Sequence, residues 1–215
     1  FVAWHGMLTA VALLQFSLIR RWRWAGAAAV VLALQLMQPL SWYLPAESTS
    51  QQPNLRLLLA NVLTSNMDKD RFLALVDAVD PDVICVQEAD DAWAEALEAL
   101  HVRYPVNSIV PRADNFGIAF YSRLPGGMSG VLFQREHDVP ALAATVEVAG
   151  RTLSILDVHA LPPIGKLMAG HRNRHLQSIR NWFEEQSGPA VLLGDLNLTM
   201  FSPEYRRFIR GTGLR

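Results

Sequence analysis

Two long apolar runs open the chain. Residues 1–19 are almost entirely apolar, and residues 25–44 form a second run that a few polar side chains interrupt. Each run is close to the ~20 residues that a helix needs to cross a bilayer. The pattern therefore predicts two transmembrane helices within residues 1–45. The alternatives are a signal peptide, which lacks a small-residue cleavage site here, and an amphipathic hairpin, which lacks a polar face.

Basic and aromatic side chains lie between the two runs. Arg20, Arg21 and Arg23 predict a cytoplasmic hairpin loop, because positive charge is retained on that side of a membrane. Trp22 and Trp24 suit the headgroup region. The chain that follows the second run is then expected on the opposite, extracytoplasmic side. The lipid bilayer is therefore a predicted partner, and no protein partner is inferred.

The pattern changes after residue 45. Residues 46–54 have no apolar periodicity and read as an exposed linker. Predicted strands then cover residues 55–62, 83–86, 117–121, 142–148, 152–158 and 190–193. Predicted helices cover residues 68–79, 92–100, 170–186 and 203–210. Strands that alternate with helices, together with one hairpin turn at residues 149–151, predict an α/β domain over residues 55–215 with mixed sheets covered by helices.

Composition refines this division. Hydrophobic residues make up 51% of the chain and charged residues 18%, which is apolar for a purely soluble protein. The first 45 residues hold three arginines and no acidic residue, so the rest holds 16 of the 19 basic residues, all 20 acidic ones and a formal charge of −4. A mildly acidic domain does not suggest non-specific binding to long nucleic acid, and it does not exclude a local basic cleft. Cys85 is the one cysteine, which excludes an intrachain disulfide.

Polar residues of a particular kind follow the predicted strands. Asn61, Glu88 and His159 each stand at the end of a strand, and Asp195 and Asn197 follow the last one. Strand ends are where rigid scaffolds present functional groups. Carboxylate and amide oxygens are ligands that Mg²⁺ prefers, and an imidazole beside them can hydrogen-bond a phosphate or carry a proton.

Each of these residues also has an ordinary structural explanation. Asn61 could form a turn, and Asp195 with Asn197 could form an Asx turn. Glu88 could cap the helix that follows it, and His159 could be a satisfied histidine before a proline turn. Singly, each residue favours its structural explanation. Their joint occurrence at strand ends favours a functional site.

Five short motifs carry a resemblance to a known family. They are Leu58-Leu59-Ala60-Asn61, Val86-Gln87-Glu88, Gly117-Ile118-Ala119-Phe120-Tyr121-Ser122-Arg123, Val158-His159-Ala160-Leu161-Pro162 and Gly194-Asp195-Leu196-Asn197. In this order they resemble the endonuclease/exonuclease/phosphatase superfamily over residues 55–215. The Gln-Glu and Gly-Asp-x-Asn motifs are the most specific. The layout of two apolar runs, linker and domain is similar to the membrane-attached bacterial members, which implies a bacterial inner or plasma membrane.

The resemblance implies a fold and a chemistry. The fold is a four-layer α/β/β/α sandwich, and the activity is metal-dependent hydrolysis of a phosphate ester. Glu88 would bind Mg²⁺, or Mn²⁺ in its place, with Asn61 nearby. His159 would contact the scissile phosphate, while Asp195 and Asn197 would position or activate the attacking water. Asn61, His159 and Asn197 are the expected substrate contacts, and the substrate would be a nucleic acid, a phospholipid headgroup or a small phosphate ester.

One departure from the family bears on activity. The family ends with a further strand and a Ser-Asp-His segment, whereas residues 198–215 complete this chain and no Ser-Asp-His occurs in it. The domain is therefore expected to be C-terminally truncated. His171 and His175 are spaced like a metal pair, but without a supporting glutamate pattern a solvated helix face is the expectation. The alternative function is a non-catalytic, membrane-tethered binding module or an inactive fragment.

Overall fold

The computed structural model describes residues 2–43, 55–133 and 139–214. The chain divides into two units, residues 1–52 and residues 53–215, and each is described by itself. The predicted linker, residues 46–54, lies outside the described residues. The predicted domain boundary there stays a prediction.

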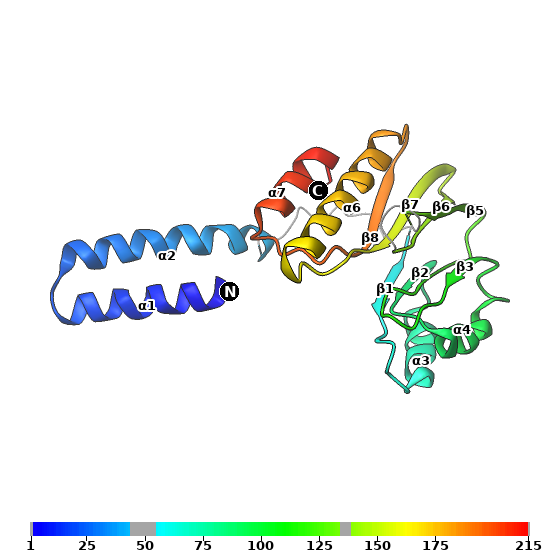
Figure 1. Cartoon of the computed structure of the whole chain (residues 1–215), viewed down its shortest axis with the longest axis horizontal. Helices are drawn as coiled ribbons and strands as arrows, with labels where there is room; N and C mark the ends of the chain where they lie inside the picture. Colours follow the sequence, from blue (N-terminus) through cyan, green and yellow to red (C-terminus); the bar gives the residue numbers. More distant parts are fainter. Residues whose placement is uncertain (1, 44–54, 134–138, 215) are drawn as a thin grey trace. The chain divides into compact units, whose positions relative to one another are not determined.

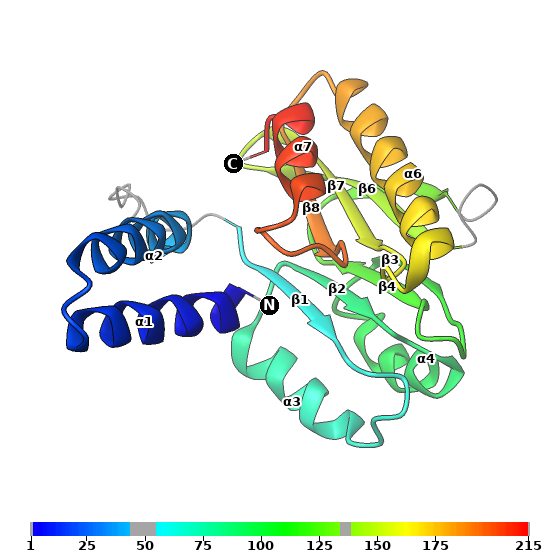
Figure 2. The same cartoon turned by 60° about the vertical axis from the view of Figure 1, so that its left-hand side comes forward.

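The first unit is a helical hairpin. It consists of α1 (Val2–Leu18) and α2 (Trp22–Tyr43), which lie side by side (Figures 1 and 2). The turn between them holds Arg20 in a left-handed conformation, with φ at 57°. Large apolar side chains face outward on both helices; Leu8 and Leu34 are each 62% exposed. The hairpin therefore presents apolar surface that its own packing does not bury.

The prediction of two transmembrane helices is wrong for the described residues. Among them, no helix is both long enough and apolar enough to cross a membrane. α1 has 17 residues, which at 1.5 Å per residue is shorter than the ~30 Å hydrocarbon core. The extracytoplasmic location was inferred from these spans, and it stays a prediction.

The second unit, called here the α/β unit, contains two four-stranded sheets within its described residues. The strands are β1 (Leu57–Asn61), β2 (Val83–Gln87), β3 (Val106–Val110), β4 (Ile118–Ser122), β5 (Gly126–Leu132), β6 (Ala141–Val148), β7 (Arg151–His159) and β8 (Ala190–Asp195). Their order is β1-β2-β4-β3 in sheet A and β5-β6-β7-β8 in sheet B. The pairs β1–β2 and β7–β8 are parallel, and the other neighbours are antiparallel. Each sheet thus has one parallel pair at an edge.

Helices cover the outer faces of the two sheets. They are α3 (Lys69–Val79), α4 (Asp91–Leu97), the short 3-10 helix η1 (Glu98–Leu100), α6 (Gly165–Glu184) and α7 (Pro203–Thr212). Figure 2 shows α3 and α4 against sheet A, and α6 and α7 against sheet B. Trp93 is buried under the first pair, and Phe208 under the second. A third apolar cluster, which includes Cys85, Phe120 and Ile155, lies between the sheets. The chain therefore has a mixed α/β fold with two sheets.

Local sequence signals explain several element boundaries. The Asp68 carboxylate accepts a hydrogen bond from the Arg71 amide at the start of α3, which satisfies a backbone donor that the helix itself leaves unpaired. Ala149 and Gly150 join β6 to β7 with φ values of 50° and 75°, as a tight two-residue hairpin turn requires. The predicted hairpin is confirmed.

The structure differs from the sequence analysis at three points. The strands β3 and β5 were not predicted, because β3 carries polar residues and β5 contains three glycines. The expectation of a solvated face is wrong for His175, which is fully buried and packs edge-on against Phe133 at 5.2 Å between ring centroids. This face of α6 turns toward sheet B rather than toward solvent.

Candidate active site

The predicted site residues meet at one edge of the two sheets. Asn61 and Gln87 are register partners at the carboxyl ends of the parallel strands β1 and β2. His159 and Asp195 are register partners at the carboxyl ends of β7 and β8. Because parallel strands end at the same edge of a sheet, each parallel pair presents two side chains there.

Glu88 follows β2 and is held by Asn61. The Asn61 amide Nδ2 donates to Glu88 Oε1 at 2.6 Å, while Asn61 Oδ1 accepts from the Leu63 amide at 3.1 Å. Asn61 therefore forms the turn considered from sequence and contacts Glu88 as well. Glu88 does not cap the next helix, because Asp90 accepts the hydrogen bond from the Trp93 amide at the start of α4.

The backbone of Glu88 is itself unusual. Its φ is 64°, a left-handed value that non-glycine residues seldom adopt. Asn115 and Asn197, at the same pocket, have φ values of 67° and 48°. Such conformations cost of order 1–3 kcal/mol each and persist where the surrounding structure imposes them, often at functional sites.

His159 lies deep at this edge. Its side chain is 5% exposed and packs on Phe116, with 5.1 Å between ring centroids. Its Nδ1 is buried without a hydrogen-bond partner among the described residues, so His159 is not an ordinary satisfied histidine. Burial lowers its pKa below the usual value, although the Asp195 and Glu88 carboxylates and a hydrogen bond with the Asn115 backbone act in the opposite direction. The neutral imidazole is therefore favoured near pH 7.

Asp195 and Asn197 form a tight turn after β8. Asp195 Oδ1 accepts from the Asn197 amide at 2.7 Å, which is the Asx turn considered from sequence. Asn197 Nδ2 donates to the Ala160 carbonyl at 2.7 Å, which ties the turn to the residue after His159. The Asn197 carbonyl in turn accepts from Arg172 on α6 at 2.8 Å. Because this turn uses Asp195 Oδ1, its second oxygen remains for other contacts.

A pocket of about 280 Å³ brings most of these groups together. It is lined by Glu88, Asp114, Asn115, Phe116, His159, Pro162, Met168, Asp195 and Asn197. The sequence did not single out residues 114–116 or Arg172. The register of β3 with β4 brings the loop between them to the same edge, since Val110 pairs with Ile118. The Arg112 guanidinium forms an ion pair with Asp114. Residues 114–116 lie on a loop without a periodic pattern, so the only sequence feature that could have indicated their role is that they directly precede the Gly117 motif.

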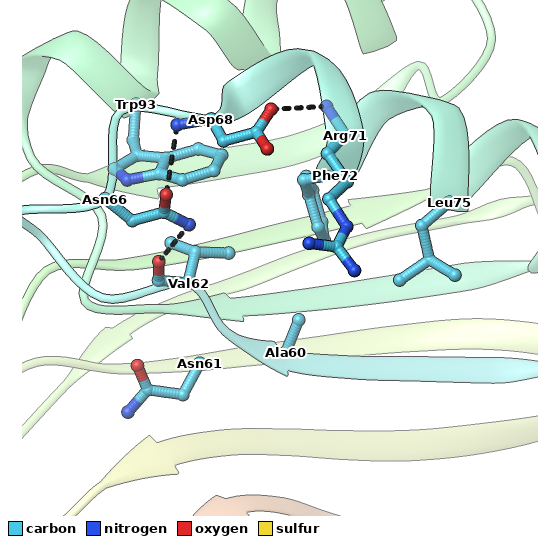
Figure 3. A pocket seen from close by; sticks show the side chains of 9 residues that line it. All are labelled: Ala60, Asn61, Val62, Asn66, Asp68, Arg71, Phe72, Leu75 and Trp93. Carbon is cyan, nitrogen blue, oxygen red and sulfur yellow. Dashed lines mark hydrogen bonds between the residues drawn. The ribbon is translucent and has the colours of Figure 1, made fainter.

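A second cavity, of about 420 Å³, lies beside this edge between β1 and α3. Asn61 belongs to its lining but stands apart from Asn66, Asp68 and Arg71 in Figure 3. Phe72 and Trp93 supply apolar surface. Asn61 therefore borders this cavity and contacts Glu88 of the 280 Å³ pocket.

The donor set at the edge suits one kind of metal ion. Within the described part of the chain, no group of three His, Cys, Asp or Glu side chains could hold a metal ion. Mg²⁺ needs less than that, since one or two carboxylates with water and substrate phosphate complete its shell. Glu88 is half-buried at a strand end with its carboxylate in a pocket, and so it fits a Mg²⁺ site of this kind.

The family of the chain follows from a comparison of its sequence with known protein families. Residues 54–215 match the Endonuclease/Exonuclease/phosphatase family. The chain belongs to this family. The match covers the whole described part of the α/β unit, including all five residues predicted for the site. No curated relative matches the chain.

Solved structures of this family's fold resemble the chain. A humanized TDP2 from D. rerio is 18% identical with a TM-score of 0.60, over 71% of this chain and 65% of that chain. Sphingomyelinase C from Streptomyces griseocarneus is 20% identical with a TM-score of 0.58, over 75% and 70%. A beta toxin mutant from Staphylococcus aureus with bound magnesium ions is 18% identical with a TM-score of 0.58, over 76% and 71%. The chain thus spans about two thirds of the TDP2 structure. At these identities the likeness shows the fold.

Proposed function

We propose that the chain is a Mg²⁺-dependent hydrolase of phosphate esters. The observation that carries the proposal is the meeting of Glu88, His159 and Asp195 around one 280 Å³ pocket, from three strand ends in two sheets. Family membership supports the same chemistry. Among the family's solved structures, the beta toxin mutant contains bound magnesium ions. A binding module without catalysis would not need a carboxylate and a buried neutral imidazole in one pocket.

Each side chain has a role that its surroundings support. Glu88, held by Asn61, would bind Mg²⁺, which neutralises charge that develops on a phosphoryl group when it is bound. His159, kept neutral by burial, has a single N–H, which hydrogen-bonds the Asn115 backbone and would turn to a phosphoryl oxygen when substrate binds. Asp195 would orient the attacking water with the oxygen that the Asx turn leaves available. Asn197 would contribute its Oδ1, because its Nδ2 already donates to Ala160.

The reaction class can be tested without knowing the natural substrate. The 215-residue chain would be incubated with bis(p-nitrophenyl) phosphate, a nicked DNA duplex and sphingomyelin vesicles, each with Mg²⁺, with Mn²⁺ and with excess EDTA. We expect metal-dependent release of product from at least one of these esters, and none in EDTA. Hydrolysis that survives EDTA would contradict the metal role. No hydrolysis with any ester or metal would favour a binding module or an inactive fragment.

We further propose that the α1–α2 hairpin binds a lipid bilayer. Apolar side chains are exposed along both helices, and Trp22 and Trp24 at the turn are 67% and 61% exposed. Three arginines beside them would meet anionic headgroups, each worth about 1 kcal/mol near such a surface. This combination supports binding at the membrane interface.

Vesicle flotation tests the hairpin. The full chain should float with vesicles that contain phosphatidylglycerol, and more weakly with pure phosphatidylcholine. Replacing Arg20, Arg21 and Arg23 together by Ala should weaken the first interaction more than the second. If the triple variant still preferred phosphatidylglycerol vesicles as strongly as the unaltered chain does, the electrostatic part would be contradicted. If the unaltered chain floated with neither kind of vesicle, the whole proposal would be contradicted.

A further inference from the structure

A buried glutamine joins the two sheets directly beneath the pocket. Gln87 is the last residue of β2 and is 1% exposed. Its Nε2 donates across the space between the sheets to the Val158 carbonyl at 2.6 Å and to Asp157 Oδ1 at 3.3 Å. Both acceptors belong to β7 of the opposite sheet. The amide therefore links sheet A to sheet B through hydrogen bonds in an otherwise apolar layer.

The glycine of the Gly-Asp-x-Asn motif makes room for this link. Gly194 has a φ of 134°, and a Cβ at this position would lie 1.8 Å from the Val158 carbonyl oxygen and 2.7 Å from Gln87 Nε2. Neither contact is possible for a real side chain. Two motif residues that the proposed chemistry leaves unused, Gln87 and Gly194, therefore serve one contact.

Each participant is followed in sequence by a candidate site residue. Glu88 follows Gln87, His159 follows Val158, and Asp195 follows Gly194. A change in the separation of these three backbone positions would shift all three functional side chains relative to one another. A displacement of about 1 Å is enough to lower an enzymatic rate about 10²-fold.

We propose that Gln87 is a positioning residue, which fixes the separation between Glu88 on sheet A and the His159–Asp195 pair on sheet B. This inference rests on the proposed function. Asp157 assists by accepting the second hydrogen bond of the same amide nitrogen, which holds the plane of the amide. Its carboxyl group is fully buried, and its Oδ2 has no hydrogen-bond partner among the described residues.

The carboxyl group of Asp157 needs no charge for this role. Burial raises its pKa to about 8, although hydrogen bonds from Gln87 and Cys85 act in the opposite direction. An asparagine at this position would keep an acceptor oxygen of the same reach. Asp157→Asn is therefore the conservative variant that should preserve the link, and Gln87→Leu is the variant of similar size that removes it.

Steady-state kinetics with bis(p-nitrophenyl) phosphate and Mg²⁺ separates positioning from general stability. We expect Gln87→Leu to lower kcat about 10–100-fold, with KM within about 3-fold, and to raise the Mg²⁺ concentration for half-maximal rate. Asp157→Asn should stay within about 3-fold of the unaltered chain. Val146→Ala is the control, because Val146 is equally buried in the inter-sheet layer but pairs with Gly126 at the far end of β6. It should lower the denaturation midpoint and leave kcat unchanged.

A second variant covers the case in which Gln87→Leu does not fold. Gln87→Asn keeps a polar amide but withdraws it by one methylene, so it should show the same loss of kcat. Calorimetric titration with Mg²⁺ gives a readout without turnover, and we expect weaker binding in both variants at Gln87. Wild-type kcat and Mg²⁺ affinity in a folded Gln87 variant, or an equal loss of kcat in Val146→Ala, would overturn the positioning role. An unaltered chain that hydrolyses no ester would instead refute the proposed function, and the inference with it.

Discussion

The two sheets are built alike but present different chemistry. In each, a parallel pair at one edge is followed by two antiparallel strands. β2 and β7 hold corresponding places, and so do the edge strands β1 and β8. In sheet A the inner strand leads to Glu88 and the edge strand ends at Asn61. In sheet B the inner strand ends at His159 and the edge strand at Asp195.

The difference lies in burial and hydrogen bonding. Glu88 is half-buried and already bonded to its edge-strand neighbour Asn61. His159 is buried, and the carboxylate of its neighbour Asp195 bonds to the Asn197 amide instead. The same backbone arrangement therefore yields a cation-binding side and a side that would donate to phosphate and orient water. Substitutions on each side should separate these two tasks.

The largest effect is expected on the sheet A side. Glu88→Gln keeps the size of the side chain and its bond with Asn61 but removes the charge that would hold Mg²⁺. We expect kcat/KM to fall by about 10³-fold or more, with unchanged circular dichroism, since one electrostatic contact alone is worth about 10²–10³. Glu95→Gln, the same change on the exposed side of α4, is the matched control. Activity within 10-fold of the unaltered chain would contradict the metal assignment.

A smaller loss is expected on the sheet B side. His159→Ala removes one donor while Glu88 and its cation-binding role remain, so kcat should fall by about 10²-fold. The Mg²⁺ concentration for half-maximal rate should hardly change, in contrast to variants at Glu88. His171→Ala, on α6, is the control. A large change in the Mg²⁺ requirement of His159→Ala would contradict the proposal that metal binding depends on the sheet A side alone.

The edge-strand side should be less sensitive still. Asn197→Ala removes the hydrogen bond from Nδ2 to Ala160 and also the Oδ1 proposed to act in the site, but it keeps the backbone amide that donates to Asp195. Losing two hydrogen bonds of about 1 kcal/mol each corresponds to roughly a 30-fold effect on rate. Asn61→Ala, measured in parallel, should raise the Mg²⁺ requirement as well, because Asn61 contacts Glu88. Equal Mg²⁺ requirements in the two variants would contradict the proposal that only the sheet A side binds the metal.

The smallest effect on activity, with a clear effect on stability, is expected for Asp157→Asn. The pKa of Asp157 is raised to about 8 in the folded chain, so the folded state binds more protons than the unfolded state between about pH 4 and pH 8. The free energy of unfolding of the unaltered chain should therefore fall as pH rises through this window, by at most about 1.4 kcal/mol per pH unit. The asparagine variant lacks this pH-dependent contribution to the free energy of unfolding, because its side chain does not titrate. Urea unfolding at pH 5 and pH 8 measures it, and an equal difference between the two proteins at both values would contradict the raised pKa.

Much of the α/β unit could be predicted from sequence, because burial leaves a readable pattern. The run Val83-Ile84-Cys85-Val86 is fully buried in β2, and the apolar spacing of α3 matches its buried face, Phe72 and Val76. β5 could not be predicted in this way. It is an edge strand with Gly126, Gly127 and Gly130, a register shift and little buried surface. Such a strand is determined by its partner β6 rather than by its own pattern.

The candidate site followed from strand ends, and what was missed came from elsewhere. Residues 114–116 lie on a loop, and Arg172 acts from a helix through the Asn197 carbonyl. No periodic pattern in the sequence around residues 114–116 or Arg172 predicts these contacts. Asp157 could have been found, since it is two residues before His159 on the same predicted strand and so shares its face. The apolar runs in residues 1–45 indicated the two helices α1 and α2, whereas the length of an apolar run alone does not distinguish a membrane span from another apolar helix.

The link made by Gln87 also constrains the order in which the chain can fold. Its two hydrogen bonds join residues that are 70 and 71 positions apart. Contacts over such distances require a large loop to close first, and they form slowly. During synthesis, sheet A can pair its strands as soon as β4 has emerged, but Gln87 has no acceptor until β7 follows. Nascent chains halted before residue 157 should therefore leave Gln87 without its partner and the future pocket open to protease.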